Sequence, residues 1–474
     1  MKHTVPPSAV PPDEEDRLDP QLVRIGLVLV LAAVLASLDG TIVNVGVGPM
    51  ASGLSTTLSV IQWVSTGYLL TVALVAPLAG WLIERFGGKR MWLASVAVFV
   101  AASALSGMAW SPSALIAFRM LQGVGGGLME PIGQAIVAKI AGPRRIGRLI
   151  GVITMPVALA PILGPVLGGI LVHGAGWRWL FYLNVPVGIA ALVLAVRIVP
   201  DDRGERQTTL KPDVLGLVLL PPGLAAVVYA LSHAGGHGLD LRHALLLAAG
   251  FALLAGYVVH ALRIRTAPLL DLRLFAGRGF TLASINTFLL GATLYSSMLL
   301  IPLYFLQVRG LSTLQAALML APQAIGTAVV TPLAGRFTDT YGPRAVVVVG
   351  IVLTLLGTVP FVLPTAHGGF AVLVAALFVR GVGFGAITPP NVAATYTSVR
   401  RSQVSAATSA RTVLNRIGGS IGTAVLAVIL QSALADGGGS VGDAYVHTFW
   451  WSLAFGALTL VPAAMYPRRA PGQD

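Results

Sequence analysis

The sequence predicts an all-α integral membrane protein, made of two six-helix bundles with two additional membrane-spanning helices between them. Hydrophobic residues fill 55% of the 474 positions, charged residues fill 10%, and the mean hydropathy is +0.83. Soluble domains carry about 25% charged residues. Apolar runs of about twenty residues, the length that crosses the ~30 Å hydrocarbon core as a helix, recur along the whole chain. Similar short segments also occur in its two halves.

Charge and cysteine content exclude several classes of protein. The net charge of +13 would suggest a nucleic-acid partner in a soluble protein, but here the basic residues separate long apolar runs. We therefore expect no nucleic acid. The absence of cysteine excludes a disulfide scaffold, a thiolate metal site and a cysteine nucleophile, and the eight histidines lack metal-ligand spacing. Neither a metal nor a cofactor is expected.

Breaks at charges and at Gly or Pro clusters divide the chain into fourteen predicted spans. They are residues 22–46, 58–83, 91–109, 112–138, 146–172, 178–198, 213–232, 242–262, 279–301, 313–335, 344–364, 370–394, 405–431 and 446–466. With the N-terminus inside, 24 of the 31 Lys and Arg fall in cytoplasmic segments, three fall outside and four fall within spans. This bias predicts that both tails, 1–21 and 467–474, are cytoplasmic, the first of them disordered.

An internal repeat defines the predicted domains. Residues 80–90 are echoed 255 residues later by 335–344, and Arg119 with its following glycines is echoed 261 residues later at Arg380. We expect an N-terminal bundle over 22–200, two inserted helices with their linkers over 201–275, and a C-terminal bundle over 276–466. Two bundles around a midplane cavity are typical of alternating-access transport.

Five motifs, placed in order on the predicted spans, resemble a known family. They lie at residues 38–45, 80–90, 119–125, 160–169 and 177–188. Together they resemble the major facilitator superfamily, specifically its fourteen-helix drug/proton antiporter branch of multidrug efflux type, over residues 22–466. Two positions depart from that pattern: Glu84 stands where Asp is usual, and Ala160 stands where the first Gly of the fifth-helix motif would be.

The resemblance implies a monomeric, proton-driven exporter of small amphipathic compounds, lipophilic or cationic, in a bacterial plasma membrane, with protons and lipids as its other partners. No Walker-type, HExxH or GxSxG motif is present, so ATP-driven transport and enzymatic chemistry are not predicted. The repeat argues against a channel. A lipid or glycolipid translocator, or a transporter of another solute, remains the alternative.

Asp39 and Glu130 are the two acids well inside predicted spans. A charged side chain at the centre of a membrane helix costs about 2.5 to 3.5 kcal/mol, so it is usually functional or paired. Asp39 and Arg119 each lie about 10 Å from the outer end of their span and can pair, while Glu130 lies about 16 Å deeper on the face of Arg119. These three residues are the predicted proton-coupling group. The alternatives are a packing anchor for Asp39, a snorkelling role for Arg119 and a solvated acid at Glu130.

The substrate cavity is predicted to have few fixed charges and several aromatic or amide side chains, which suits amphipathic ligands. Ordinary helix packing is the alternative for each residue. The candidates are Asn44, Gln122, Gln134, Phe288, Tyr295, Gln307 and Asn391.

Two further motifs are expected to control conformation. In the fifth predicted span, small residues and a proline that removes a backbone donor favour a hinge and seal between bundles, with tight packing as the alternative. Its residues are Gly164, Pro165, Gly168 and Gly169. The loop after the second span is expected to hold one state through charge pairs, although a plain topology signal explains its basic residues equally well. Its residues are Gly80, Glu84, Arg85, Gly87 and Arg90, with Asp339 and Arg344 as the counterpart in the second half.

Overall fold

The computed structural model describes residues 20–201, 213–237, 241–264, 268–363, 369–435 and 440–466. These residues form helices and no strand. The predicted tails and most of the linker before the inserted helices therefore lie outside the described residues. Ten helices in the described part are long and apolar enough to cross a membrane. The all-helical membrane fold is confirmed, and the count of fourteen spans stays a prediction.

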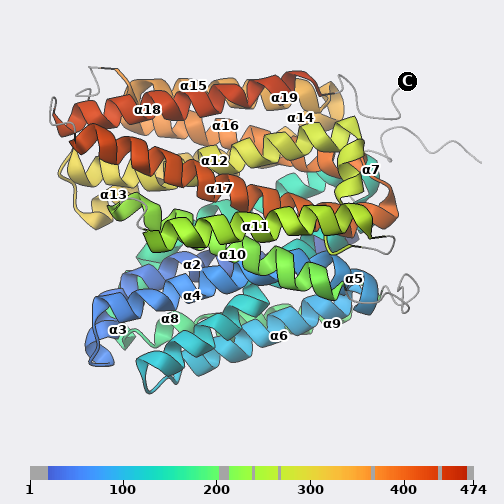
Figure 1. Cartoon of the computed structure of the whole chain (residues 1–474), viewed down its shortest axis with the longest axis horizontal. Helices are drawn as coiled ribbons and strands as arrows, with labels where there is room; N and C mark the ends of the chain where they lie inside the picture. The colour runs from blue at the N-terminus through green and yellow to red at the C-terminus, as the bar shows by residue number, and fades with distance from the viewer. Residues whose placement is uncertain are drawn as a thin grey trace, which may run out of the picture.

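The N-terminal helices form one group, in the lower half of Figure 1. Their bounds are α2 Pro20–Ile42, η1 Val43–Gly46, α3 Val47–Gly53, α4 Leu58–Val75, η2 Ala76–Leu78, α5 Ala79–Phe86, α6 Gly88–Gly107, α7 Pro112–Ala175, α8 Trp179–Tyr182 and α9 Asn184–Ile198. Local sequence explains several of the ends. Thr57 caps α4 by accepting from the Val60 N–H, and Ser111 caps α7 in front of Pro112, whose missing N–H costs nothing at a first helical position.

Helix α7 differs from the two separate spans predicted at 112–138 and 146–172, because its 64 residues are helical without interruption. It nevertheless reverses direction. Arg119 contacts Asp39 of α2, and Gly164 packs against Thr41 of the same helix, although a straight helix would separate Arg119 and Gly164 by about 67 Å. The fourth and fifth predicted spans thus lie side by side, and the helical hydrogen bonding continues through the bend between them.

The C-terminal helices form the second group, in the upper half of Figure 1. Their bounds are η4 Leu272–Ala276, α12 Arg278–Gln307, α13 Thr313–Met319, α14 Ala321–Tyr341, α15 Pro343–Thr358, η5 Val359–Phe361, α16 Phe370–Thr397, η7 Arg401–Gln403, α17 Val404–Ala435, α18 Val441–Leu458 and α19 Leu460–Ala464. A capping box between Ser440 and Asp443 starts α18.

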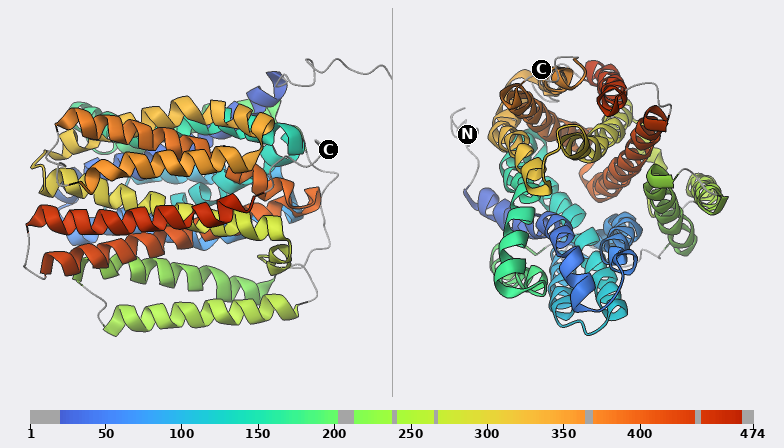
Figure 2. Two further views of the ribbon diagram at one scale, coloured as in Figure 1. Left: turned by 90° about the horizontal axis from the view of Figure 1, so that it is seen from above. Right: turned by 90° about the vertical axis from the view of Figure 1, so that its left-hand side faces the viewer.

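The inserted helices α10 (Val214–His237) and α11 (Leu241–Arg263) lie at the edge of the molecule in the end-on view of Figure 2. Helix α10 packs against α17 and α4. Polar contacts fix the pair at one end: Asp213 accepts from His260 Nε2 at 2.7 Å and from the Leu269 N–H at 3.1 Å. The hydroxyl of Tyr257 donates to the Leu270 carbonyl and accepts from the Leu270 N–H. The linker before α12 is therefore tied to the inserted pair.

Glycine packing shows the register of the internal repeat. Gly87 and Gly342, 255 residues apart, end α5 and α14 with φ of 89° and 81°, a conformation that glycine adopts without strain. Gly125 packs on Ser95 and Phe99 as Gly383 packs on Gly350 and Thr354, and Gly127 packs on Val72 as Gly385 packs on Thr327. The fourth-helix repeat is therefore offset by 258 residues, so Arg380 takes the place of Gln122 and not that of Arg119.

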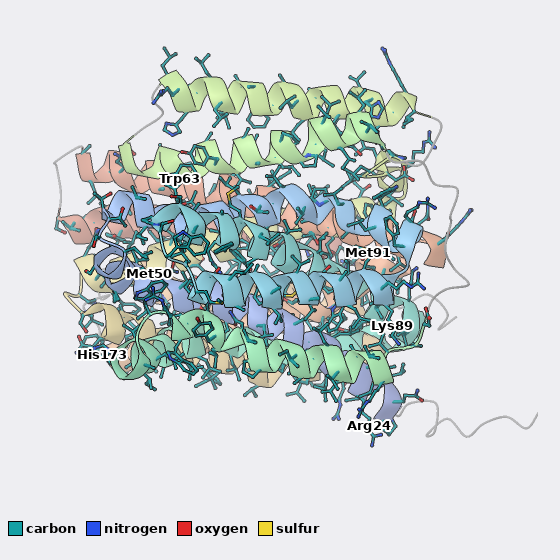
Figure 3. All side chains as sticks on the ribbon, turned by 90° about the horizontal axis from the view of Figure 1, so that it is seen from below. Arg24, Met50, Trp63, Lys89, Met91 and His173 are labelled. Atoms are coloured by element: carbon teal, nitrogen blue, oxygen red, sulfur yellow. The ribbon has the colours of Figure 1, made fainter. Side chains whose placement is uncertain are left out.

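The two groups touch through several helices, chiefly α7 against α14. The Gly80 N–H donates to Ser409 Oγ at 2.8 Å, and Arg411 donates to Gln134 Oε1. Figure 3 shows Arg24 and Lys89 near one end of the helices and Met50 and His173 near the opposite end. That separation agrees with the sides predicted for these four residues.

Candidate functional site

A buried ion pair joins α2 to α7. Arg119 Nη1 lies 2.6 Å from Asp39 Oδ2, and the two side chains are 1% and 0% exposed. The pairing inferred from helix depth is thus present in the structure. Its strength follows from geometry and burial, because a charge-assisted hydrogen bond in a region of low dielectric is stronger than one in water.

Two amides complete the surroundings of the Asp39 carboxylate. Oδ1 accepts from Gln122 Nε2 at 3.0 Å and from Asn184 Nδ2 at 2.8 Å. Asn184 Nδ2 also donates to Ser103 Oγ at 3.0 Å. Side chains from α2, α6, α7 and α9 therefore meet at one carboxylate, and every printed contact to it comes from a donor that favours its ionised form.

The guanidinium of Arg119 is held from its other sides as well. Its Nε donates to the Val64 carbonyl at 3.3 Å, and Nη1 also donates to Gln122 Oε1 at 2.7 Å. The Tyr68 ring lies 4.3 Å from Cζ, close enough for a cation–π contact. Tyr68 reaches this position because a Cβ at Gly126 would stand 2.6 Å from its hydroxyl. The small residues of the fourth-helix motif thus admit the ring beneath the arginine.

Glu130 belongs to a second group on the same helix. Its Oε1 accepts from Gln134 Nε2 at 3.2 Å, and Gln134 Oε1 in turn accepts from Arg411 of α17. Glu130, Gln134 and Arg411 are all half-buried. The group therefore links the N-terminal and C-terminal helices, whereas the Asp39 group lies wholly among the N-terminal helices.

Comparison with known proteins agrees with this architecture. The family model described as Major Facilitator Superfamily matches residues 29–423 and, in a second overlapping match, residues 283–474. The chain belongs to the Major Facilitator Superfamily. This result confirms the family, and the existence of a second match that begins in the C-terminal half agrees with the internal repeat.

Named relatives extend this result. The multidrug resistance protein B homolog of Mycobacterium tuberculosis (strain ATCC 25618 / H37Rv) is 38% identical over 419 residues, covering 88% of this chain and 77% of that protein. The tetracenomycin C resistance and export protein of Streptomyces glaucescens is 30% identical over 411 residues, covering 86% and 76%. Major Facilitator Superfamily relatives thus include multidrug resistance and export proteins, and the chain is a multi-pass membrane transporter of this group.

Solved structures support the fold. The proton:xylose symporter XylE bound to 6-bromo-6-deoxy-D-glucose has a TM-score of 0.66 at 15% identity and covers 93% of this chain and 94% of its own. The human organic anion transporter MFSD10 has a TM-score of 0.63 at 18% identity and covers 94% and 100%. At these identities the likeness shows the Major Facilitator Superfamily fold alone.

The residues predicted to line a single cavity occupy separate places. Gln122 is buried beside Asp39, and Gln134 bridges Glu130 to Arg411. Asn44 is exposed and accepts from Ser65, whereas the exposed Gln307 accepts from Tyr445 at the far end of α12. Of the remaining three, Tyr295 lies beneath Arg416, Phe288 packs against Gly418, and Asn391 is buried among Thr287 and Asn286. The described structure does not gather these seven side chains at one site.

The fifth-helix motif packs on α2. A Cβ at Gly164 would stand 2.1 Å from Thr41 Oγ1, and one at Gly168 would stand 3.0 Å from Ile42. Nothing lies within 4 Å of a Cβ at Gly169, and the side chain of Pro165 is outside the described residues. The contacts of Gly164 and Gly168 are therefore with the N-terminal helices, and the hinge between bundles stays a prediction.

In the loop motif, Gly80 contacts the other half of the molecule, Gly87 forms the left-handed helix end, and Arg85 lies over Phe86. Glu84 and Arg344 are half-buried, Arg90 is exposed, and the Asp339 side chain is outside the described residues. The predicted charge pairing therefore stays a prediction. Lys89 has a defined contact: its Nζ donates to the Val196 and Val199 carbonyls at the end of α9.

Sequence reasoning missed two members of the Asp39 group, Asn184 and Ser103. Asn184 stood only in the sixth-helix motif, and nothing in its spacing from Asp39 predicts contact across 145 residues. A polar side chain on an otherwise apolar span was the available signal. Among the described residues, no three His, Cys, Asp or Glu side chains gather where they could hold a metal ion.

Proposed function

We propose that this chain is a proton-coupled exporter of small amphipathic compounds, which it moves by alternating access. The observation that carries the proposal is the fully buried Asp39 carboxylate, held by one guanidinium and two amides. Relatives named for multidrug resistance and for tetracenomycin C resistance and export support the substrate class. A carboxylate that loses its ion pair when it binds a proton can couple proton binding to helix movement.

Proton binding to Asp39 acts on four helices at once. The neutral acid no longer attracts the Arg119 guanidinium, which then keeps Gln122, the Val64 carbonyl and the Tyr68 ring as partners. The connection between α2 and α7 weakens, while Arg119 remains on the α4 side. Proton binding and release would thus shift α2 relative to α4 and α7.

Asn184 supplies a place for the proton. Its Oδ1 is buried and has no hydrogen-bond partner, although its Nδ2 donates to Asp39. Rotation of the amide by half a turn would bring Oδ1 to Asp39, where it can accept from the protonated carboxyl group. The same side chain can therefore stabilise both the charged and the neutral form of Asp39.

Glu130 has a different part in the proposal. It lies at the contact with α17 and is linked through Gln134 to Arg411. A half-buried carboxylate at this contact can attract a cationic substrate, or bind a second proton as the helices separate. Asp39 is thus assigned to coupling, and Glu130 to the recognition of substrate charge.

The test is substrate-induced proton release from proteoliposomes that contain the full-length protein. Native protein is compared with Asp39→Asn, Glu130→Gln and, as a control acid outside the spans, Asp201→Asn. The substrates are matched lipophilic cations and neutral amphiphiles. We expect Asp39→Asn to lose gradient-driven transport of every substrate, Glu130→Gln to lose cations selectively, and Asp201→Asn to behave as native.

Gradient-driven transport that survives in both Asp39→Asn and Glu130→Gln would remove the site assignment. Transport that is independent of any pH gradient in native protein would remove proton coupling itself. In the bacterial plasma membrane, the proposal places both termini in the cytoplasm, on the basis of the positive-inside bias. It also assigns function to the monomer, since one chain carries both halves of the repeat.

A further inference from the structure

The C-terminal helices carry a polar cluster that corresponds to the Asp39 group. The register set by glycine packing places Arg380 opposite Gln122, and the same 258-residue offset places Ser297 opposite Asp39. A second contact supports this offset for α2 and α12: Gly133 lies against Leu29 as Asn391 contacts Thr287. The 255-residue offset of the neighbouring helices places Gln323 opposite Tyr68 and Thr358 opposite Ser103.

These corresponding residues are in contact with one another. Arg380 Nε donates to Thr358 Oγ1 at 3.1 Å, Nη1 donates to Gln323 Oε1 at 3.3 Å, and Nη2 donates to Ser297 Oγ. The Phe384 ring lies 5.1 Å from Cζ. Arg380 is 1% exposed, so the guanidinium is as deeply buried as that of Arg119.

The two clusters differ in charge. The Asp39 group contains one carboxylate and one guanidinium, so its charges balance. Around Arg380 the acceptors are two hydroxyls and an amide, and no carboxylate of the described residues forms an ion pair with it. Arginine stays protonated in proteins, so this cluster carries an uncompensated positive charge in the part of the molecule that excludes water.

An isolated buried charge is far costlier than a buried pair, and neutral acceptors offset only part of that cost. The position at which the N-terminal half supplies its carboxylate is occupied here by the shorter, neutral Ser297. We propose that the Arg380 cluster is a binding site for a monovalent anion, either the carboxylate of an amphipathic substrate or a chloride ion. The anion supplies the negative charge that Asp39 supplies in the other half.

The cluster has donors and a route for such a ligand. A guanidinium has five N–H groups, and the printed contacts of Arg380 use three. Gln323 is half-buried and forms the exposed edge of the cluster. Next to it is a cavity of about 10 Å³, close to the smallest that holds one water, lined by Thr293, Thr354 and Phe384 among others. The proposal rests on this cluster alone and does not require proton coupling.

The experiment measures thermal unfolding of the full-length protein in nanodiscs of neutral lipid, at low ionic strength, while chloride or octanoate is titrated. Ser297→Asp places a carboxylate where the anion would bind, and Ser297→Asn is its matched neutral control. Arg380→Gln removes the positive charge and retains a polar side chain. Comparison of variants at the same salt concentration removes general ionic effects.

Native protein and Ser297→Asn should show a rise in the unfolding midpoint that saturates with anion. Ser297→Asp should unfold at a higher temperature than native protein without added anion, and should lose the saturable rise. Arg380→Gln should weaken anion binding at least about tenfold, because hydrogen bonds to charged groups contribute about 1.5–3 kcal/mol. Saturation by octanoate well below the chloride range identifies a substrate carboxylate, and equal or tighter saturation by chloride identifies the inorganic ion.

Two results would overturn the proposal. One is an equal response of native protein and Ser297→Asp to both anions. The other, which holds even if Ser297→Asp does not fold, is an Arg380→Gln variant that keeps the native response. A native protein that responds to neither anion would also exclude the site.

Discussion

The backbone N–H of Gly80 donates a hydrogen bond of 2.8 Å to Ser409 Oγ and so joins the second helix of one half to α17 of the other. A Cβ at Gly80 would stand 2.9 Å from that hydroxyl and 3.0 Å from the Ser405 carbonyl. Only glycine lets the two backbones approach this closely. In the proposed alternating-access cycle, this contact must break when the molecule opens at this end.

Replacing Gly80 should therefore shift the molecule away from the conformation described here. The chain has no cysteine, so Ser405→Cys introduces a single label site, and Ser405 is fully buried. We expect Gly80→Ala to increase the maleimide labelling rate of Ser405→Cys several-fold, since a shift of 1.4 kcal/mol is about tenfold in a population. The control is Gly169→Ala, where a Cβ meets nothing within 4 Å. Equal labelling in both backgrounds would show that Gly80 packing does not control access.

The Asp39–Arg119 pair predicts strongly non-additive stability effects. Asp39→Asn leaves a buried guanidinium without its counter-ion and should destabilise the protein by about 3–5 kcal/mol. Arg119→Gln should do the same to the carboxylate, whereas the double variant should be less destabilised than the sum of the two. Unfolding midpoints in one detergent measure all three variants, with Asp201→Asn as the exposed control. Simple additivity would mean that the pair contributes nothing beyond its separate members.

Asn184 predicts the direction of a pH shift. Its amide donates to the Asp39 carboxylate, and a hydrogen bond to a charged group is about twice as strong as one between neutral groups. Asn184→Leu therefore destabilises the charged form of Asp39 more than the neutral form. The pH midpoint of proton-driven transport should move to higher pH, while Asn44→Leu, which alters an exposed amide, should leave it unchanged. A midpoint that stays in place or moves to lower pH would contradict the assigned contact.

Tyr257 predicts a stability effect at the inserted helices. Its hydroxyl makes two hydrogen bonds with the backbone of Leu270, one of them to a buried N–H. Tyr257→Phe leaves that N–H without its partner and should cost about 1–3 kcal/mol. Limited proteolysis of the linker before α12 should show faster cleavage than in native protein. As a control, Tyr341→Phe alters an exposed tyrosine and should cleave at the native rate.

Much of the fold could be predicted from sequence, because membrane spans obey a simple physical rule. The hydrocarbon core requires long apolar helices, so the runs ending near Ile42, Phe86 and Gly107 identify themselves. The repeated loop glycines, Gly87 and Gly342, also mark helix ends that the structure confirms. The boundary predicted between residues 138 and 146 was wrong as a helix break, because a bent helix keeps its hydrogen bonds without a sequence interruption.

The sequence by itself determined the membrane class, the superfamily, the repeat and the depth at which Asp39 and Arg119 could meet. Tertiary structure alone decided which neutral side chains join them, since Asn184 and Ser103 come from other helices and spacing carries no information on such contacts. It also decided the register that places Arg380 opposite Gln122. Register depends on which glycines admit a neighbouring backbone, and that is a property of packed helices rather than of a sequence motif.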